Sequence, residues 1–149
     1  MRSLLFIMMV LLLSCTKEKE DEQYLKFKVD GVAINATENA FANKPAQFGD
    51  GIIISSFWQG GSIQLEIMDT DGAKVYPVSS TTRISYSENN NPYYAGDFMG
   101  SPVRGSGKIT ITELTPDYVK GSFEGQLPAS APGMATKIIS EGQFSLKRK

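Results

Sequence analysis

KITITELTPDYVKGSFEGQL, residues 108–127, predicts two β-strands separated by a turn. In its first part Ile109 and Ile111 alternate with polar residues, which is the period of a strand with one buried face. Residues 115–117, Thr-Pro-Asp, supply the turn. One face of the second strand is expected to hold Val119, Gly121, Phe123, Gly125 and Leu127. We expect this face to be buried, with the glycines leaving room for large neighbours or marking bulges.

The beginning of the domain shows the same alternation around a tight turn. Residues 24–29 alternate apolar and polar side chains, and the pattern resumes at 32–36 after Asp30-Gly31. An Asp-Gly pair between two such segments is a strong hairpin signal, because both turn positions need a positive φ. The sequence therefore predicts a β-hairpin over residues 24–36.

Further short segments with strand character fill the rest of the chain. Residues 51–58 are the most apolar of them and are expected to form a central strand. Residues 38–50 show no clear period and would hold one helical turn at most. The remaining strands are expected near 63–67, 73–78, 83–87, 93–98 and 137–147.

The fold class that follows is all-β. No stretch sustains a helical period, and eight to ten short antiparallel strands predict either a β-sandwich or a partly closed barrel. Residues 24–149 are expected to form a single domain, since domains most often hold about 100–150 residues. That length is enough to bury a core without disulfides or metals.

The first fifteen residues resemble a bacterial lipoprotein signal. Arg2 provides a positive start, residues 4–13 are continuously apolar, and Ser14-Cys15 follows at once. A membrane-spanning helix needs about 20 apolar residues, whereas a signal-peptide core needs about 7–15. This order is similar to the lipobox, at which a diacylglycerol is attached to the cysteine before cleavage. We therefore expect residues 1–14 to be a signal peptide and Cys15, the one cysteine of the chain, to carry the lipid that anchors the protein to the membrane.

Residues 15–23 combine this cysteine with a charged tether. Residues 16–23 read TKEKEDEQ and offer nothing apolar to bury, so the segment is expected to stay solvated. Its lysine and acidic residues also resemble the export signal of Bacteroidota surface lipoproteins, and Thr16 in place of aspartate argues by analogy against retention in the inner membrane. The expected location is the outer membrane, with the cell surface implied by the tether.

Composition excludes several classes of function. Loss of residues 1–14 removes Arg2, so the basic count falls from 15 to 14 against 16 acidic residues, a net charge of −2. This balance does not fit a nucleic-acid binder. The chain has no histidine, and lipidation would occupy its cysteine, so triads, histidine bases and thiolate chemistry have no residues to use. No cofactor is expected, and we expect no enzymatic activity. The open alternative is a hydrolase that uses carboxylates alone, such as a glycosidase.

Two sets of residues are candidates for a site. Asp69 and Asp71 could supply oxygen ligands to a calcium ion, although the sequence 69–72, Asp-Thr-Asp-Gly, reads more simply as a hairpin turn. Trp58, Tyr93 and Tyr94 could stack on a ligand, against the alternative that they belong to the core. Since adjacent strand residues face opposite sides, one of the two tyrosines is expected to be exposed.

Several motifs resemble a family of small Bacteroidota lipoproteins of unknown function. They are KVDG at 28–31, GSGKITITEL at 105–114, GSFEG at 121–125 and EGQF at 141–144. The family often has a tryptophan after the opening turn, where this chain has Ile34. The resemblance implies the β-sandwich-like fold and the membrane-anchored location of a lipoprotein. It implies no particular activity. The expectation is a membrane-anchored module that binds a glycan, a peptide or a protein.

Overall fold

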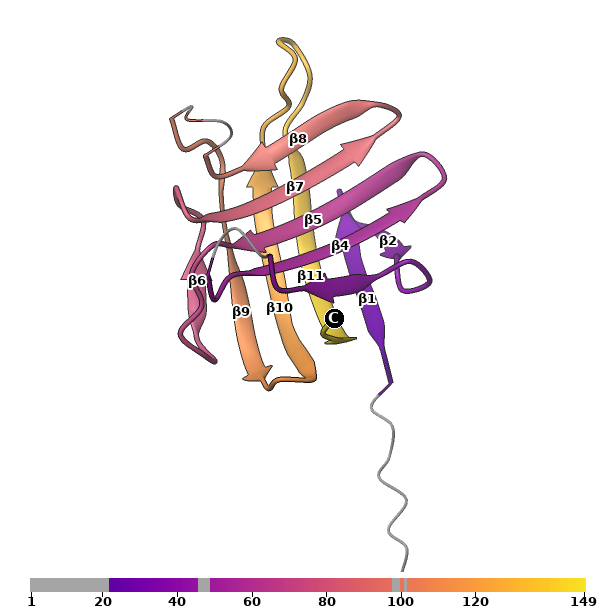
Figure 1. Ribbon diagram of the computed structural model, residues 1–149. Coiled ribbons are helices and arrows are strands. Elements are labelled where there is room, and N and C mark those ends of the chain that lie inside the picture. The colour runs from indigo at the N-terminus through magenta and orange to yellow at the C-terminus, as the bar shows by residue number, and fades with distance from the viewer. Residues whose placement is uncertain (1–21, 46–48, 98–99, 101) are drawn as a thin grey trace, which may run out of the picture.

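A computed structural model describes residues 22–45, 49–97, 100 and 102–149 (Figure 1). The predicted signal peptide, Cys15 and nearly all of the tether lie outside the described residues. Among the described residues no helix is long and apolar enough to cross a membrane. The strands are β1 (Tyr24–Val29), β2 (Val32–Asn35), β3 (Phe41–Asn43), β4 (Ile52–Trp58), β5 (Gly61–Ile67), β6 (Val75–Pro77), β7 (Thr82–Glu88), β8 (Asn91–Ala95), β9 (Ser106–Leu114), β10 (Tyr118–Leu127) and β11 (Lys137–Lys147).

These strands form two antiparallel sheets that pack as a sandwich and do not close into a barrel. The six-stranded sheet has the order β2-β1-β11-β10-β9-β6, and the five-stranded sheet has the order β3-β4-β5-β7-β8. Figure 1 shows that the strands of the five-stranded sheet run across those of the six-stranded sheet. The expected all-β sandwich is confirmed.

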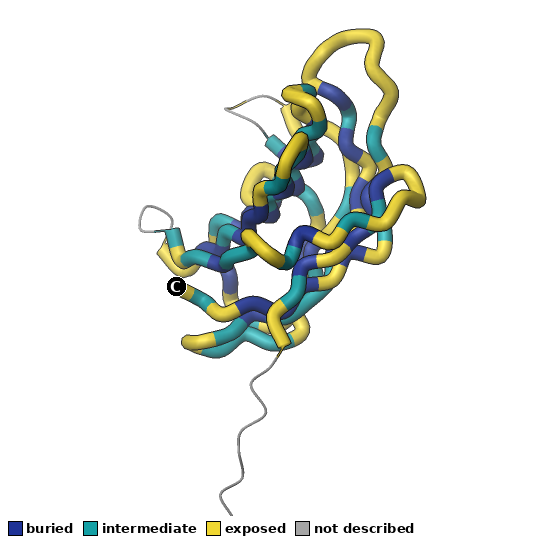
Figure 2. Tube along the Cα trace, turned by 90° about the vertical axis from the view of Figure 1, so that its right-hand side faces the viewer, coloured by how far each residue is buried: buried dark blue, intermediate teal, exposed yellow. Residues whose placement is uncertain are grey.

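The core lies between the two sheets and comes from the alternating residues of both (Figure 2). On β10, Val119, Phe123 and Leu127 are all buried, as the sequence predicted, while Glu124 is exposed. On β11, Phe144 and Leu146 point to the same interior. Burial of these large apolar side chains is the main source of stability for a chain with no disulfide.

Two tight turns follow directly from local backbone chemistry. Asp30 and Gly31 connect β1 to β2 with φ values of 51° and 83°, as expected for the Asp-Gly pair. Asn89 and Asn90 connect β7 to β8 with φ values of 50° and 65°. Asparagine tolerates this left-handed conformation better than most residues, so the Asn-Asn pair gives a second two-residue hairpin.

A bulge on β11 bends the six-stranded sheet. Phe123 pairs with Gly142 and Gly125 pairs with Ile139, so one residue of β10 lies opposite two of β11. Glu141, inside this bulge, has a φ of 52°. A Cβ at position 142 would lie 2.7 Å from the ring carbons of Phe123, so the glycine allows that ring to lie across β11. Bulges of this kind increase local twist.

Three expectations about individual strands were wrong. Residues 38–50 contain a short strand, β3. It is held by backbone pairing with β4, although its sequence shows no strand alternation. The segment 51–58 contains β4, which is one position from the edge because β3 is its other neighbour; β5 is the central strand. The described part of the chain forms eleven strands rather than eight to ten.

The segment 69–72 also differs from the hairpin turn that the sequence indicated. It follows β5 of the five-stranded sheet and leads into β6, which pairs with β9 of the six-stranded sheet. Residues 69–72 are therefore part of a crossing between sheets. Turn-forming residues favour a change of direction in either case, so local sequence does not distinguish a hairpin from a crossing.

Candidate functional site

The outer face of the five-stranded sheet carries a group of small, uncharged polar side chains. Ser62 pairs with Ser87, Gln64 pairs with Ser85, and Ser85 pairs in turn with Tyr94. Their neighbours along the strands, among them Ile63, Leu65 and Ile84, are buried in the core. Because side chains alternate between the faces of a strand, the serines and the glutamine project outward together.

These side chains form the floor of a pocket of about 150 Å³. Its described lining residues are Ser62, Gln64, Ser85, Tyr86, Ser87, Pro92, Tyr93, Tyr94 and Ser130. None of these residues is charged. Hydroxyl and amide groups therefore lie beside the ring of Tyr94 in one small hollow, which suits a neutral ligand with both polar groups and an apolar surface.

Tyr94 stands at the edge of this pocket and is held in place from outside the strand. Nη1 of Arg104 donates to the Tyr94 hydroxyl at 3.2 Å, and the guanidinium lies over the ring at 5.4 Å from its centroid. Nη2 of Arg104 donates to the carbonyl of Ala129 at 3.2 Å. A tyrosine fixed in this way loses little side-chain freedom when a ligand binds.

Tyr93 points the other way, as its neighbouring position on β8 requires. It is buried and packs with Tyr86 at 6.1 Å between ring centroids. The sequence predicts that one of the two tyrosines is exposed; Tyr94 does face outward but is half-buried rather than exposed. The alternation places the two side chains on opposite faces of the sheet, and only the Tyr94 ring lies on the outer face, where the pocket is.

Trp58 lies on the inner side of β4 with the core aromatics. Its ring is 6.0 Å from Phe27 and 6.3 Å from Tyr86. The indole also covers Gly61, where a Cβ would lie 2.6 Å from its ring atoms. The position of Trp58 therefore separates it from Tyr94, and the structure does not bring the three candidate aromatic residues into one site.

Tyr86 lies on the core side of the sheet behind the pocket and stays protonated at physiological pH. Burial raises the pKa of the Tyr86 hydroxyl to about 12, with a smaller contribution from the charge of Glu88. Since the ordinary tyrosine pKa is 10, the folded state favours the protonated form. This contribution to stability is complete below pH 10 and is lost as the pH rises through about 12.

An ion-paired lysine near the Tyr86 hydroxyl connects the two sheets. Nζ of Lys137 lies 3.1 Å from carboxylate oxygens of both Asp30 and Glu88 and 5.8 Å from the ring centroid of Tyr93. Hydrogen bonds to the two carboxylates raise the pKa of Lys137, and the Ile138 N–H lowers the pKa of Asp30. The β1–β2 turn, the end of β7 and the start of β11 are thereby joined, which supports the pocket on a rigid frame.

The two aspartates considered as calcium ligands lie apart from this pocket. Asp71 accepts hydrogen bonds from Lys74 Nζ at 2.6 Å and from the Tyr76 hydroxyl at 3.1 Å. The lysine holds the pKa of Asp71 below its usual range. Asp69 is exposed on the same segment. Among the residues that the structure describes, no group of three or more histidine, cysteine, aspartate or glutamate side chains is placed to hold a metal ion.

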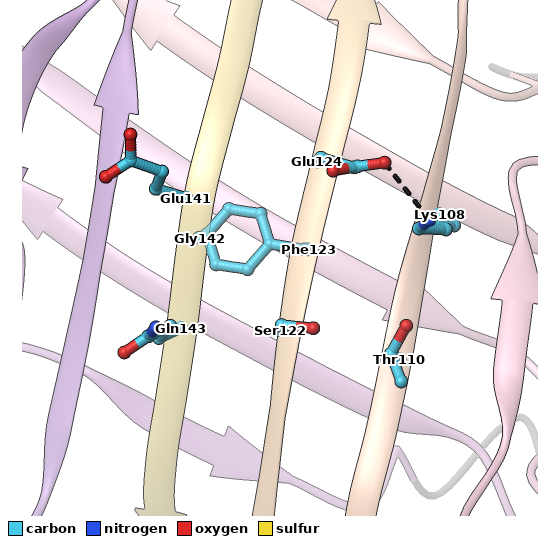
Figure 3. Close-up of a pocket in the computed structure, with 8 residues that line it drawn as sticks. All are labelled: Lys108, Thr110, Ser122, Phe123, Glu124, Glu141, Gly142 and Gln143. Carbon is cyan, nitrogen blue, oxygen red and sulfur yellow. Dashed lines mark ion pairs between the residues drawn. The ribbon is translucent and has the colours of Figure 1, made fainter.

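The six-stranded sheet has a hollow of its own on the outer side of β9, β10 and β11 (Figure 3). It has a volume of about 350 Å³, and its polar lining includes Thr110, Ser122 and Gln143. Its two carboxylates, Glu124 and Glu141, point away from each other in Figure 3. Glu124 pairs with Lys108 at 3.2 Å and Glu141 pairs with Lys28 at 2.7 Å.

This second hollow gives no geometric support to a pair of carboxylates acting on one bond. In a glycosidase the two carboxyl groups face each other across the substrate. Here each is directed to its own lysine on a neighbouring strand. We therefore take the pocket on the outer face of the five-stranded sheet, lined by Ser62, Gln64, Ser85, Ser87 and Tyr94 and called the serine pocket below, as the candidate binding site.

Sequence reasoning identified Tyr94 but missed the serines around it. Serine and glutamine at the polar positions of a strand look like an ordinary solvated face. The available signal was that Ser62, Gln64, Ser85 and Ser87 are all short or neutral, whereas the polar positions of β1, β9 and β10 include lysines and glutamates. No family model, curated protein or solved structure matches the chain.

Proposed function

We propose that this protein is a lipid-anchored, non-enzymatic binding module of the bacterial outer membrane, and that it binds a neutral glycan in the serine pocket. The observation that carries the proposal is the pocket that Tyr94 lines together with the uncharged side chains Ser62, Gln64, Ser85 and Ser87. A sugar ring has hydroxyls around its rim and C–H groups on its faces, so hydroxyl partners and an aromatic ring suit it together.

Peptide and protein ligands fit this pocket less well. An extended peptide normally adds to an exposed sheet edge, where backbone groups are available, whereas this pocket lies on a sheet face. A standard protein interface buries about 800 Å² on each partner around an apolar centre. A pocket of about 150 Å³ is also smaller than the sites of about 300–1,000 Å³ that enclose drug-sized ligands. A single ring resting against the face is the better match.

The location rests on the N-terminal sequence. Arg2, the apolar run and Cys15 support lipidation, and the charged residues after Cys15 support a solvated tether that holds the domain away from the membrane. β1 begins at Tyr24, directly after this segment. The domain would then present the serine pocket to ligands at the cell surface.

Replacing Cys15 with alanine should release the protein from the membrane fraction. One acyl chain gives only marginal membrane binding, while two or more anchor a protein stably, so loss of the diacylglycerol removes the anchor. Fractionation and fatty-acid labelling measure this directly. Ser14→Ala keeps a small residue before the cysteine and should leave labelling intact. Membrane retention of the Cys15→Ala protein would contradict the lipoprotein assignment.

Replacing Tyr94 with alanine should weaken glycan binding about tenfold or more, which is about 1.4 kcal/mol. The full-length protein, purified in detergent, is screened against neutral oligosaccharides built from glucose, mannose, xylose or N-acetylglucosamine, and affinities are measured by calorimetry. Tyr24→Ala, on the six-stranded sheet, is the matched control and should bind as the parent does. If the parent protein binds no member of the panel, or if Tyr94→Ala binds equally well, the proposal is wrong.

A further inference from the structure

We infer that the ligand is a chain of several sugar units that crosses the five-stranded sheet from Tyr94 to a second aromatic contact at Phe41 and Phe57. This inference rests on the proposed function, because it assigns the length of the glycan that the serine pocket binds. It makes Phe41 and Phe57 part of the binding face.

Strand register places the two contacts on one line across the sheet. Phe41 pairs with Ser55, Ser55 with Gln64, Gln64 with Ser85, and Ser85 with Tyr94. All five side chains share the outer face, since residues directly opposite in an antiparallel pair point to the same side. The line crosses β3, β4, β5, β7 and β8, which are all the strands of this sheet.

The second contact is an aromatic surface rather than a buried cluster. The rings of Phe41 and Phe57 stack with centroids 6.3 Å apart and planes inclined by 26°. Phe57 is 55% exposed, whereas large aromatic residues on strands usually contribute to the core. Asn39 Nδ2 donates to the Phe57 carbonyl at 2.9 Å, which connects the β3 side of the sheet to β4 beside the rings.

The length of the line excludes a single ring as the whole ligand. Strands in a sheet are spaced by about 4.8 Å, so four steps from β3 to β8 span about 19 Å. One sugar ring covers the pocket at Tyr94 but does not reach Phe57. A chain of several rings can rest on an aromatic surface at each end and on hydroxyl and amide groups between them.

The charge of this face favours a neutral chain. Among the described residues on the outer side of these strands, the charged side chains are Glu66 and Arg83, and they pair with each other. Between the aromatic ends the line offers Gln64 and Ser85, while Ser55 is only 3% exposed beneath its neighbours. At the Tyr94 end the nearest cation is Arg104, whose guanidinium already donates to the Tyr94 hydroxyl and the Ala129 carbonyl. The strands between the two aromatic ends present no charged side chain on the line to replace the lost hydration of a charged polymer. A neutral oligosaccharide is the occupant that this surface suits.

Affinity measured against chain length tests the inference. The probes are neutral homo-oligosaccharides of two to six units from the same four sugars, titrated by calorimetry into the full-length protein in detergent. We expect affinity to rise at least tenfold between two and six units of the preferred sugar. Phe57→Ala should abolish this gain and leave binding of the two-unit probe unchanged. Tyr94→Ala should weaken binding of both.

The outcomes separate this inference from the proposed function. If the two-unit and six-unit probes bind the parent protein equally, or if Phe57→Ala keeps the full gain, the second contact is wrong while the serine pocket stands. If no probe binds the parent protein, both are wrong. Val75→Ala, an exposed apolar residue on the six-stranded sheet, is the control and should keep the gain. Thermal melts establish that Phe57→Ala is folded, and Phe57→Ser supplies a second variant at the same exposed position.

Discussion

Replacing Phe123 with alanine is expected to lower the free energy of unfolding by about 3–5 kcal/mol. The residue is 3% exposed, and its ring lies 5.7 Å from Phe27 and 6.3 Å from Phe144 between centroids. It also covers Gly142, so its removal would expose the bulge on β11 as well as create a cavity. A loss of this size is a large part of the stability of a typical domain, about 5–15 kcal/mol.

The adjacent residue provides the control for this substitution. Glu124 points outward and pairs with Lys108 on the surface, so Glu124→Ala should change stability by no more than about 0.5 kcal/mol. Denaturant melts of the full-length protein measure both changes. Equal, small effects at the two positions would show that the inner face of β10 is wrongly assigned.

Removing the charge of Arg83 is the second substitution with a large expected effect. Its guanidinium forms an ion pair with Glu66, and the two side chains are only 19% and 10% exposed. Gln64 Nε2 donates to the Glu66 carboxylate at 3.0 Å, and Arg83 Nη1 donates to the Asp97 carbonyl at 3.2 Å. Arg83→Met would leave the Glu66 carboxylate without its cation, and we expect a loss of about 3 kcal/mol.

A double substitution distinguishes a buried pair from a solvated one. Glu66→Gln together with Arg83→Met removes both charges, so it should recover at least half of the stability that Arg83→Met loses. Chemical denaturation of the two variants gives the comparison. A loss below about 0.5 kcal/mol for Arg83→Met would instead mean that the pair behaves as an ordinary surface ion pair.

The parts of the fold that were predicted correctly depend on local chemistry. The Asp30-Gly31 turn follows from the positive φ that two-residue hairpins require, and the buried face of β10 follows from strand alternation. The opposite orientations of Tyr93 and Tyr94 also follow from alternation alone. These features need no knowledge of which strands become neighbours.

The parts that were missed depend on partners distant in the sequence. β3 is a strand because β4 lies beside it and because Lys149 donates to the Ala42 carbonyl at 2.9 Å. Residues 69–72 cross between sheets because β6 finds its partner in β9. The left-handed Glu141 is set by a bulge opposite β10 and β1, and a glutamate gives no local signal of it.

The candidate site also has one part that the sequence predicted and another that it did not. Tyr94 could be predicted from the sequence because an aromatic residue on the outward-facing side of a strand can contact a ligand, and the alternation of Tyr93 and Tyr94 puts one of them there. The serine floor and the line from Phe41 to Tyr94 could not, since they exist only after β3, β4, β5, β7 and β8 assemble in that order. The register also separated Trp58 from the surface by placing it opposite Gly61, on the inner side of β4.

The most direct test of the central claim is a map of backbone amide chemical shifts in the isotopically labelled protein, with and without the neutral oligosaccharide panel. Binding on the outer face of the five-stranded sheet predicts the largest shifts at Ser62, Ser85, Ser87 and Tyr94. Shifts confined to the hollow of the six-stranded sheet, at Thr110, Ser122 and Gln143, or no shifts with any member of the panel, would contradict the account.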